Sequence, residues 1–466
     1  MVTRIRVKNF RSIHSAEVNL SKMTVLVGAN GTGKSNLIKA LLLISKIPDE
    51  GLGVALASMG GALALIPRAK SKSLANSSQI EIEYDVEISR PPRYDPAWPT
   101  PMATHELHIR PAQNDSYLIA NERVLFTGAL ELLASLEDNE IVRERILKAV
   151  KSNDRFSEVK VRVKKSEATF ETRFGRSPLS RRILLDWLGV PVPEDVPYER
   201  KALEGMLSRI FTRGSDTDQA RTRSGHFSKY SLFDPKVRMP LDYSRQASGL
   251  RWQMQNIRRY DLLLNELRAE QHVSATGELG SEGQSLPGAL RLLEERSPEK
   301  LERLKSTLCE LAPFISGVQV EPLRSAKEFI QFVEKSSGRP VESWDSSDGT
   351  LRALGLLVAL ELQPKYTTAM IEEPELNLHP WAVRTIMRHV RDLQEANKIQ
   401  VLISTHSPFV LEHVAKEEVF VVERTLEAGT TFTRVDSIAP LMQSDMVDIG
   451  RLWVKGLLRG VPSAEC

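Results

Sequence analysis

Cysteines and long hydrophobic runs are scarce in this sequence. Its 466 residues include 2 cysteines, Cys309 and Cys466, which cannot build a disulfide framework or a cysteine-rich zinc site. No stretch approaches the ~18 uninterrupted apolar residues of a membrane-spanning helix. The first residues, MVTRIRVKNFRSI, have no apolar segment after their positive charges and do not read as a signal peptide. We therefore expect a cytoplasmic protein that does not associate with membranes.

Internal repeats, low-complexity tracts and long heptad runs are also lacking, so coiled-coil arms are not expected. The net charge of +3 conceals two basic stretches. Residues 143–182 contain 13 Lys and Arg against 5 Asp and Glu, and residues 201–260 contain 12 against 5. Such stretches form either a solvated charged face or a surface for nucleic acid or an acidic partner.

The order of predicted elements indicates the fold class. Strands are predicted at residues 3–10, 23–27, 79–88, 159–165, 327–335, 367–371, 399–405 and 417–424. Helices are predicted after residue 33 and at residues 129–150, 251–270, 286–296, 297–313, 351–362 and 380–397. Residues 51–68 are expected to be a loop with a short strand. Alternating apolar strands and helices predict an α/β fold with a mostly parallel, doubly wound sheet.

This pattern divides the chain into three regions. Residues 1–110 are expected to form the first lobe of a P-loop core, and residues 285–466 its second half. Residues 111–284 are expected to be a basic, mainly helical insertion that splits the core.

Residues 28–35, GANGTGKS, fit the phosphate-binding pattern G-x-x-x-x-G-K-[ST] between a predicted strand and a predicted helix. The glycines free the backbone so that successive N–H groups point at phosphate oxygens, at the positive end of the helix. Lys34 is expected to reach the β- and γ-phosphates, and the Ser35 hydroxyl to be a magnesium ligand. The predicted nucleotide-binding residues here are Asn30, Gly31, Thr32, Gly33, Lys34, Ser35 and Asn36.

Two adjacent glutamates follow the predicted strand 367–371 in the sequence IEEPELNLHP. They are either two solvated loop residues or a pair that serves a nucleoside triphosphate and its metal. In the second interpretation Glu372 holds Mg²⁺ through water, while Glu373 orients and deprotonates the attacking water. Pro374 keeps Glu373 out of the α region and so fixes the turn. The metal and Lys34 would offset the two negative charges.

Two further segments complete the pattern. His406 ends the predicted strand 399–405 in STHSP, where it is either a capping group or a contact to the γ-phosphate and its attacking water. SSDGT opens the predicted helix 351–362 with small polar residues, which favours a second anion site with Ser347 and Gly349 facing outward. One chain needs only one phosphate cradle, so we expect the second one to close over a nucleotide held by another subunit.

Together GANGTGKSN, SDGT, IEEPE and STHS resemble an ABC-type ATPase of the SMC/RecF kind over about residues 1–90 and 285–425. EEPELNLHP and SDGTLR resemble most the ATPase part of the overcoming-lysogenization-defect (OLD) family and its stand-alone relatives. The resemblance implies ATP as the nucleotide, head-to-tail nucleotide sandwiches in a homodimer or higher homo-oligomer, Glu373 as catalytic base and His406 as γ-phosphate sensor. It also implies a signature formed in trans by Ser347, Gly349 and Thr350, and Arg11 near the nucleotide.

The sequence departs from that family in three places. Glu372 stands where an aspartate is usual, which lengthens the reach to magnesium. Gln79 is a candidate for the glutamine of the lid loop, whose position the sequence does not fix. The residues after His406 lack the pattern of a Toprim nuclease, so we expect any cleavage to belong to a partner.

Three functions fit these features. The first is the ATP-driven sensor or motor subunit of a bacterial multi-protein system, favoured as anti-phage defence with a separate effector nuclease or toxin. The second is a RecF-like DNA-repair ATPase that clamps DNA directly, with nucleic acid bound through the basic insertion. The third is a scaffold that holds ATP and barely hydrolyses it.

Overall fold

The computed structural model describes residues 1–67, 79–88, 100–112, 116–127, 158–164, 167–173, 245–273, 276–324, 326–397, 399–438 and 448–458. These residues divide into two compact units. Unit 1 comprises residues 1–19, 39–255 and 425–430, and unit 2 comprises residues 20–38, 256–424 and 431–466. The helix predicted at 129–150 and most of both basic stretches lie outside the described residues.

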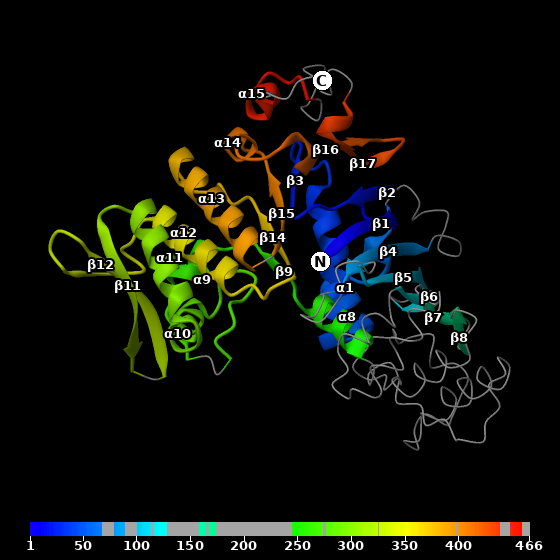
Figure 1. The fold of residues 1–466 in the computed structure, drawn as a ribbon, viewed down its shortest axis with the longest axis horizontal. Coiled ribbons are helices and arrows are strands. Elements are labelled where there is room, and N and C mark those ends of the chain that lie inside the picture. The colour runs from blue at the N-terminus through cyan, green and yellow to red at the C-terminus, as the bar shows by residue number, and fades with distance from the viewer. Residues whose placement is uncertain are drawn as a thin grey trace, which may run out of the picture. The chain divides into compact units, whose positions relative to one another are not determined.

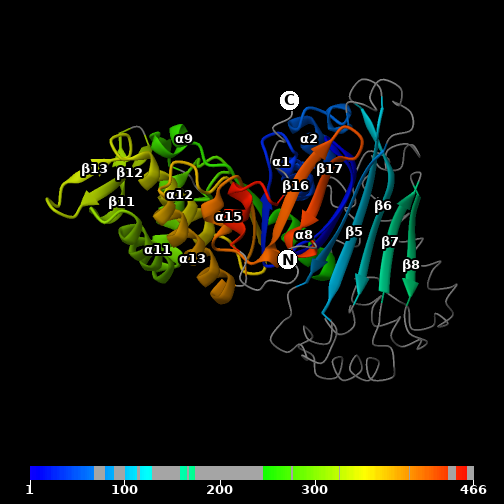
Figure 2. The same ribbon diagram turned by 90° about the horizontal axis from the view of Figure 1, so that it is seen from above.

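Unit 1 is built on an antiparallel sheet (Figures 1 and 2). Its strands follow the order β8-β7-β6-β5-β4-β1-β2. Their bounds are β1 Val2–Phe10, β2 Ile13–Asn19, β4 Ile80–Glu87, β5 Met102–Pro111, β6 Tyr117–Thr127, β7 Glu158–Lys164 and β8 Glu167–Arg173. Along β4 the apolar residues at every second position are buried, so the alternation read from the sequence correctly predicted a strand with one face in the core.

The opposite face of this sheet carries cross-strand ion pairs. Arg4 on β1 bonds Asp85 on β4 at 2.7 Å, and Lys8 bonds Glu81 at 2.9 Å.

The helices of unit 1 are α1 (Lys34–Glu50, whose first residues belong to unit 2), α2 (Leu52–Ser58), α8 (Arg245–Gln255) and the 3-10 helix η1 (Leu63–Leu65). The expectation of a loop with a short strand at 51–68 was therefore wrong: residues 52–58 form a helix whose Leu52, Ala55 and Leu56 are buried.

Unit 2 contains five parallel strands in the order β16-β3-β15-β14-β9. They are β3 Met23–Val27, β9 Ile257–Tyr260, β14 Thr368–Glu372, β15 Gln400–Thr405 and β16 Val419–Thr425. Every residue of β3 and β15 is buried, as expected for parallel strands covered on both faces. The predicted α/β fold class is confirmed, with the parallel strands in unit 2 and the antiparallel ones mainly in unit 1.

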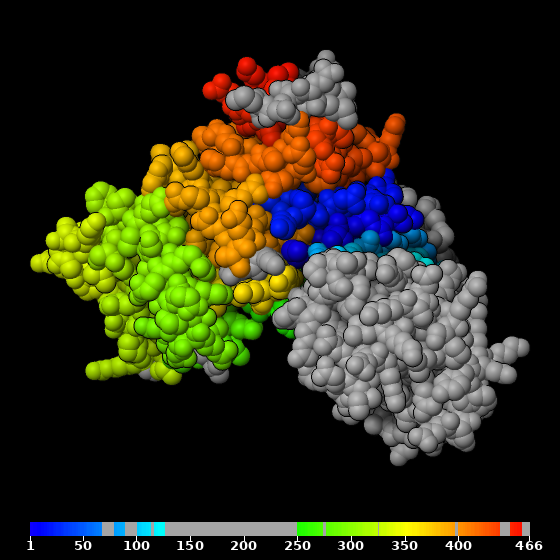
Figure 3. All heavy atoms as spheres, viewed as in Figure 1, coloured from blue at the N-terminus to red at the C-terminus, as the bar shows by residue number. Residues whose placement is uncertain are grey.

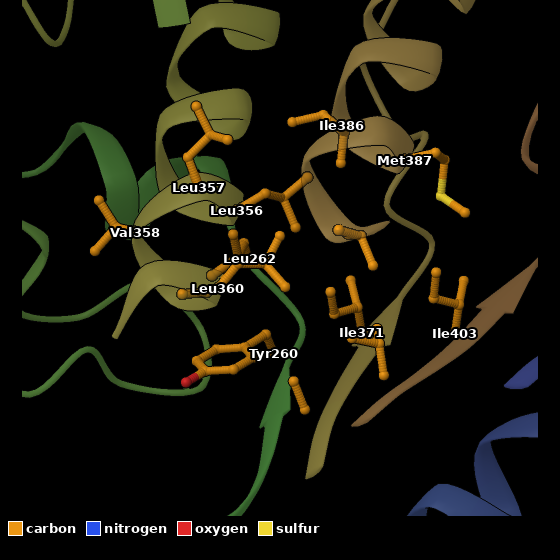
Figure 4. Packing of buried hydrophobic residues seen from close by; sticks show 14 of the residues in the cluster. Tyr260, Leu262, Leu356, Leu357, Val358, Leu360, Ile371, Ile386, Met387 and Ile403 are labelled. Carbon is orange, nitrogen blue, oxygen red and sulfur yellow. The ribbon is translucent and has the colours of Figure 1, made fainter. Parts of the chain in front are cut away.

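Two helices cover one face of β14 and β15 (Figures 1 and 4). These are α12 (Asp348–Glu361) and α13 (Pro380–Asn397). Leu356 of α12 and Met387 of α13 face Ile371 of β14 and Ile403 of β15 in the core, and all four are at most 1% exposed. Burial of such side chains contributes about 1.5–3 kcal/mol each, so this layer holds the strand ends in fixed positions.

The remaining elements of unit 2 lie mostly before α12 in the sequence. They are α9 (Leu264–Arg268), α10 (Leu286–Arg296), α11 (Pro298–Leu311) and a smaller antiparallel sheet of β10 (Gln271–His272), β11 (Ile315–Leu323), β12 (Lys327–Glu334) and β13 (Pro340–Glu342). After β15 come α14 (Pro408–Leu411), the 3-10 helices η4 (Lys416–Glu418) and η5 (Val435–Ser437), β17 (Gly429–Arg434, shared with unit 1) and α15 (Ile449–Val454). None of the helices within the described ranges is long and apolar enough to cross a bilayer.

The single helix predicted at 251–270 was wrong. The chain leaves α8 after Gln255, forms the short strand β9 and re-enters a helix at Leu264. Strand β9 pairs in parallel with β14, with Ile257 opposite Thr368 and Tyr260 opposite Ile371. Pairing with a neighbouring strand thus outweighs the local helical pattern. In the same way, the described part of residues 111–284, the segment expected to be mainly helical, includes strands β6 to β10 as well as α8 and α9.

Candidate active site

The candidate site lies in unit 2, at the edge where the parallel strands end. Strand β3 runs into Gly28, β14 ends at Glu372 and β15 ends at Thr405, just before His406. Carboxyl ends of parallel strands meet at one edge of the sheet, which is where such folds bind ligands. The sequence-predicted glycine loop, glutamate pair and histidine are therefore brought together.

The glycine loop needs its glycines at three positions. A Cβ on Gly28 would lie 2.3 Å from the carbonyl oxygen of Val422, so no side chain fits there. Gly31 and Gly33 have φ of 78° and 108°, in the left-handed region that disfavours side chains. Helix α1 begins at Lys34, and the Thr32 hydroxyl donates to the Ala29 carbonyl at 2.9 Å. A cradle of backbone amides at a helix start fits a phosphate group.

Lys34 points back across this loop. Its Nζ donates to the carbonyls of Gly28 at 2.8 Å and Ala29 at 3.1 Å, and to Nε2 of His406 at 2.9 Å. Burial lowers the pKa of Lys34 to about 8, while the nearby carboxylates, that of Glu373 first, act in the opposite direction. The cation is thus held over the loop and is easier to deprotonate than an ordinary lysine.

The Ser35 hydroxyl and the Glu372 carboxylate meet directly, with Oγ donating to Oε2 at 2.6 Å. The other oxygen of Glu372 accepts from Nε of Arg259 at 2.6 Å, and the same guanidinium bonds Asp261 at 2.6 Å. A hydroxyl beside a carboxylate at the mouth of a phosphate loop is the oxygen donor set that Mg²⁺ prefers. These residues fit that metal, although Arg259 competes for the same carboxylate.

Glu373 has an unusual backbone. Its φ is 46°, which is rare for a residue with a side chain and is costly before a proline. The turn is held on both sides: the Glu373 N–H donates to Ser404 at 2.8 Å, and its carbonyl accepts from Arg352 at 3.0 Å. The carboxylate is 36% exposed, and its Oε1 lies 3.5 Å from Nε2 of His406. It is therefore aimed at the neighbouring strand end and stays accessible to water.

His406 lies between the acid and the cation. Burial, and then the charge of Lys34, lower the pKa of His406, while Glu373 opposes the shift. The lowered pKa favours the neutral ring, in which an unprotonated Nε2 accepts a hydrogen bond from the ammonium group of Lys34. In this tautomer Nε2 can also accept a hydrogen bond from a water without adding a second positive charge, whereas a hydrogen bond to a phosphate oxygen requires the tautomer with Nε2–H.

The SSDGT segment opens α12 as predicted. Ser347 is the N-cap: its Oγ accepts from the Thr350 N–H at 3.2 Å and lies 2.7 Å from the Thr350 hydroxyl. A Cβ on Gly349 would lie 2.8 Å from the carbonyl of Asn377, so glycine allows the turn after β14 to approach closely. Asp348 would repel an anion, but it pairs with Arg268 and accepts from Asn377 at 3.1 Å.

Two predicted residues lie in unit 1. Arg11 has a φ of 52° and donates from Nη2 to the Met59 carbonyl at 3.2 Å, and burial lowers the pKa of its guanidinium. Gln79 donates to Glu81 at 3.1 Å, and its carbonyl accepts from Asn9 at 3.0 Å. Their roles toward the nucleotide stay predictions.

Sequence reasoning missed four side chains at the site. Arg259 lies in the basic stretch 201–260, for which the sequence leaves a solvated face or a nucleic-acid surface, but it is on β9 and pairs with Glu372 and Asp261. Arg352 holds the Glu373 turn. Glu375 and Trp453 both bond the backbone of His406. The signal for Arg259 was the flanking Ile257 and Tyr260, which favour a strand; Trp453 had none.

Two family models match the chain. A model described as "AAA domain, putative AbiEii toxin, Type IV TA system" matches residues 194–412, and a model described as "AAA ATPase domain" matches residues 1–171. Each model covers less than half of the chain, and both indicate similarity to AAA-type ATPase domains. A curated relative, protein ea59 of Escherichia phage lambda, is 39% identical over 59 residues, which is 13% of this chain and 11% of that protein.

Solved structures of SMC head domains also align with the chain at low similarity. The SMC head of Thermotoga maritima is 12% identical with a TM-score of 0.35, and covers 93% of this chain and 98% of its own. The head domain with extended coiled coil bound to the C-terminal domain of ScpA from Pyrococcus furiosus is 13% identical with a TM-score of 0.40, covering 95% and 98%. A SMC head bound to the C-winged helix domain of ScpA is 11% identical with a TM-score of 0.40, covering 95% and 99%.

Proposed function

We propose that the chain binds and hydrolyses ATP as an ABC-type ATPase of the SMC/RecF kind. The observation that carries the proposal is the convergence of Lys34, Glu373 and His406 at the strand ends, with Nε2 of His406 2.9 Å from the lysine and 3.5 Å from the glutamate. A cation for phosphate and a water-accessible carboxylate, each in contact with a neutral imidazole, are the groups that phosphoryl transfer to water requires.

The roles of the residues follow from their chemistry. When bound, Mg²⁺ would be held by the Ser35 hydroxyl and the Glu372 carboxylate with phosphate oxygens, and would neutralise negative charge. Lys34 binds the β- and γ-phosphates. Glu373 takes a proton from the attacking water as the new P–O bond forms and the bond to the β-phosphate oxygen breaks. Once Lys34 turns to the phosphates, Nε2 of His406 either accepts a hydrogen bond from the attacking water or, as the Nε2–H tautomer, donates to the γ-phosphate, and so holds the reacting group in line.

We further propose that the site is completed by a second copy of the chain. Ser347, Gly349 and Thr350 at the start of α12 would close over the nucleotide of the partner, since an N-terminal helix end attracts anions. Support comes from three large apolar side chains that follow the strand ends: Leu376, Trp381 and Phe409 are 43%, 44% and 41% exposed. Exposed apolar side chains in the segments that follow the strand ends favour coverage by another protein surface.

The biological setting we favour is a bacterial defence system against phage, in which this chain is the sensor or motor and a separate nuclease or toxin is the effector. The proposal is supported by the EEPELNLHP and SDGTLR motifs, and by the toxin–antitoxin description of the family model over residues 194–412. The short likeness to a phage lambda protein agrees with a link to phage biology.

Turnover tests the catalytic assignment. Glu373→Gln should lower the rate of phosphate release about 10²- to 10⁴-fold, the usual contribution of a general base, while ATP affinity is retained. Glu302→Gln on α11 is a matched control, because that carboxylate is 72% exposed and pairs only locally with Lys305 in the same helix. A wild-type chain without turnover, or an unchanged rate in the Glu373 variant, would refute the assignment.

Assembly and DNA binding separate the candidate functions. Light scattering with ATP should show a larger species for Glu373→Gln and none for Lys34→Ala, because the nucleotide joins the copies.

The basic stretches of the sequence keep a RecF-like DNA clamp as the second candidate. Tight, steeply salt-dependent binding to duplex DNA by the chain alone would favour that candidate over a defence motor.

A further inference from the structure

The backbone of His406 is held by side chains on both sides. Its N–H donates to Oε1 of Glu375 at 3.1 Å, and its carbonyl oxygen accepts from the indole Nε1 of Trp453 at 3.2 Å. Neither bond belongs to the sheet, because β15 ends one residue earlier. The peptide units that carry the imidazole therefore depend on these two side chains for their orientation.

The side-chain hydrogen bonds of Glu375 go to the end of β15, besides one to its own backbone. The same Oε1 also accepts from the Thr405 hydroxyl at 2.6 Å, and Thr405 in turn accepts from the Ser407 N–H at 2.9 Å. Burial raises the pKa of Glu375, and within the described residues its Oε2 is buried without a hydrogen-bond partner. Burying a carboxylate costs free energy when one of its oxygens makes no hydrogen bond. The hydrogen bonds that Oε1 accepts therefore best explain why Glu375 occupies this position.

Trp453 comes from the far end of the chain. It lies on α15, a short helix capped by Asp448, and its ring packs against the core of unit 2. Helix α15 contacts α14, the helix that follows His406. Figure 3 shows the atoms of this segment, drawn in red, on the surface beside the orange atoms of the residues around β15 and β16. The indole thus reaches His406 from a surface segment.

We propose that Glu375 and Trp453 are positioning residues for His406: they fix its peptide planes so that Nε2 stays directed at Lys34 and Glu373. The inference rests on the proposed function for its catalytic consequence, but not for the contacts themselves. A rotation of either peptide plane would swing the ring away from the place where water and γ-phosphate meet. Losing an anchor should therefore reduce turnover more than nucleotide affinity, which depends on the glycine loop.

Trp453→Phe tests the carbonyl anchor, because phenylalanine keeps an aromatic ring and removes the N–H donor. We expect kcat to fall about two- to tenfold, the size of one hydrogen bond, with the Kd for ATP within about twofold of wild type. Trp344→Phe is the matched control, since that indole stacks on Phe329 in unit 2 at 4.8 Å and is no part of the site. An unchanged kcat, or a parallel loss of kcat, ATP binding and Tm, would overturn the inference.

A pair of variants at Glu375 tests the other anchor. Glutamine keeps the acceptor oxygen and leucine removes it, while both remove the charge. Glu375→Gln should therefore retain kcat within about twofold, whereas Glu375→Leu should lose about two- to tenfold. Equal losses in both variants would mean that the carboxylate acts through its charge and would overturn the positioning role.

Hydrogen exchange measures how the two hydrogen bonds restrain the backbone around His406, independently of ATPase activity. In the full chain, Trp453→Phe and Glu375→Leu should each raise exchange in a peptide covering residues 404–411, and Trp344→Phe should not. Unchanged protection in the first two variants would overturn the inference even in an active enzyme. If the wild-type chain lacks ATPase activity and both variants still exchange faster than the wild-type chain, the anchoring role is supported and the proposed function is rejected.

Discussion

The buried position of Lys34 predicts that nucleotide affinity falls in mildly alkaline solution. The pKa of its ammonium group is lowered to about 8, chiefly by burial. Phosphate binding requires the charged form, so the apparent affinity is proportional to the protonated fraction of the free protein. At pKa ~8 that fraction is about nine-tenths at pH 7 and about one-tenth at pH 9, so the affinity should weaken about tenfold.

The sign follows from linkage. A bound phosphate stabilises the ammonium and raises the pKa of Lys34 in the complex, so binding takes up a proton at pH 9 and hardly any at pH 7. Titration with a fluorescent ATP analogue at constant ionic strength measures the change, and calorimetry in two buffers of different ionisation enthalpy measures the proton uptake. Lys34→Arg is the control, because arginine stays charged over this range and should flatten the profile even where its affinity is lower. A flat wild-type profile, or the same slope in Lys34→Arg, would refute the reasoning.

Three further predictions concern the loop, the metal ligand and the core. Gly28→Ala should abolish ATP binding or lower Tm, because its Cβ would lie 2.3 Å from the Val422 carbonyl; normal binding with an unchanged Tm would contradict the glycine requirement. Arg259→Met should lower the Mg²⁺ concentration needed for half-maximal nucleotide binding, since the guanidinium and the metal compete for Glu372, and an unchanged Mg²⁺ titration would exclude that competition. Leu357→Ala should lower the free energy of unfolding by about 2–5 kcal/mol in urea denaturation, and a loss below about 1 kcal/mol would mean that the site collapses around the gap.

The parts of the site that could be predicted from the sequence are those made by local structure. A buried strand, a glycine loop and a helix start within one short stretch fix where Lys34 and Ser35 lie. Glu372 and His406 each follow a continuous apolar run, and parallel strands bring their carboxyl ends together whatever the length of chain between them. For these residues, the residue type and its position at the end of a predicted strand were enough to predict the place in the site.

Arg259 could not be placed in this way. Its strand has 4 residues and gains its hydrogen bonds only from β14, more than a hundred residues later in the chain. The surrounding sequence has enough apolar residues at helical spacing to favour a helix, which is what we predicted. The structure makes the adjacent Tyr260 a buried core residue and turns Arg259 toward the carboxylate of Glu372. Only the pairing of β9 with β14 in the folded chain brings Arg259, which the sequence places on a helix, into the candidate site.

Trp453 shows a second reason why sequence motifs leave a site incomplete. The motif residues supply the candidate reacting groups. The sheet fixes the backbone before His406, but no hydrogen bond of the sheet restrains the peptide units on the other side of this residue. In this chain that side is held by Glu375, three residues after Glu372, and by the indole of Trp453, 47 residues after His406. Because the indole sits on a short surface helix, any partner that moves α15 would change the angle of His406 without touching the nucleotide. The ends of the strands thus bring the candidate reacting groups together, and under the proposed function a segment outside every motif holds one of them in place.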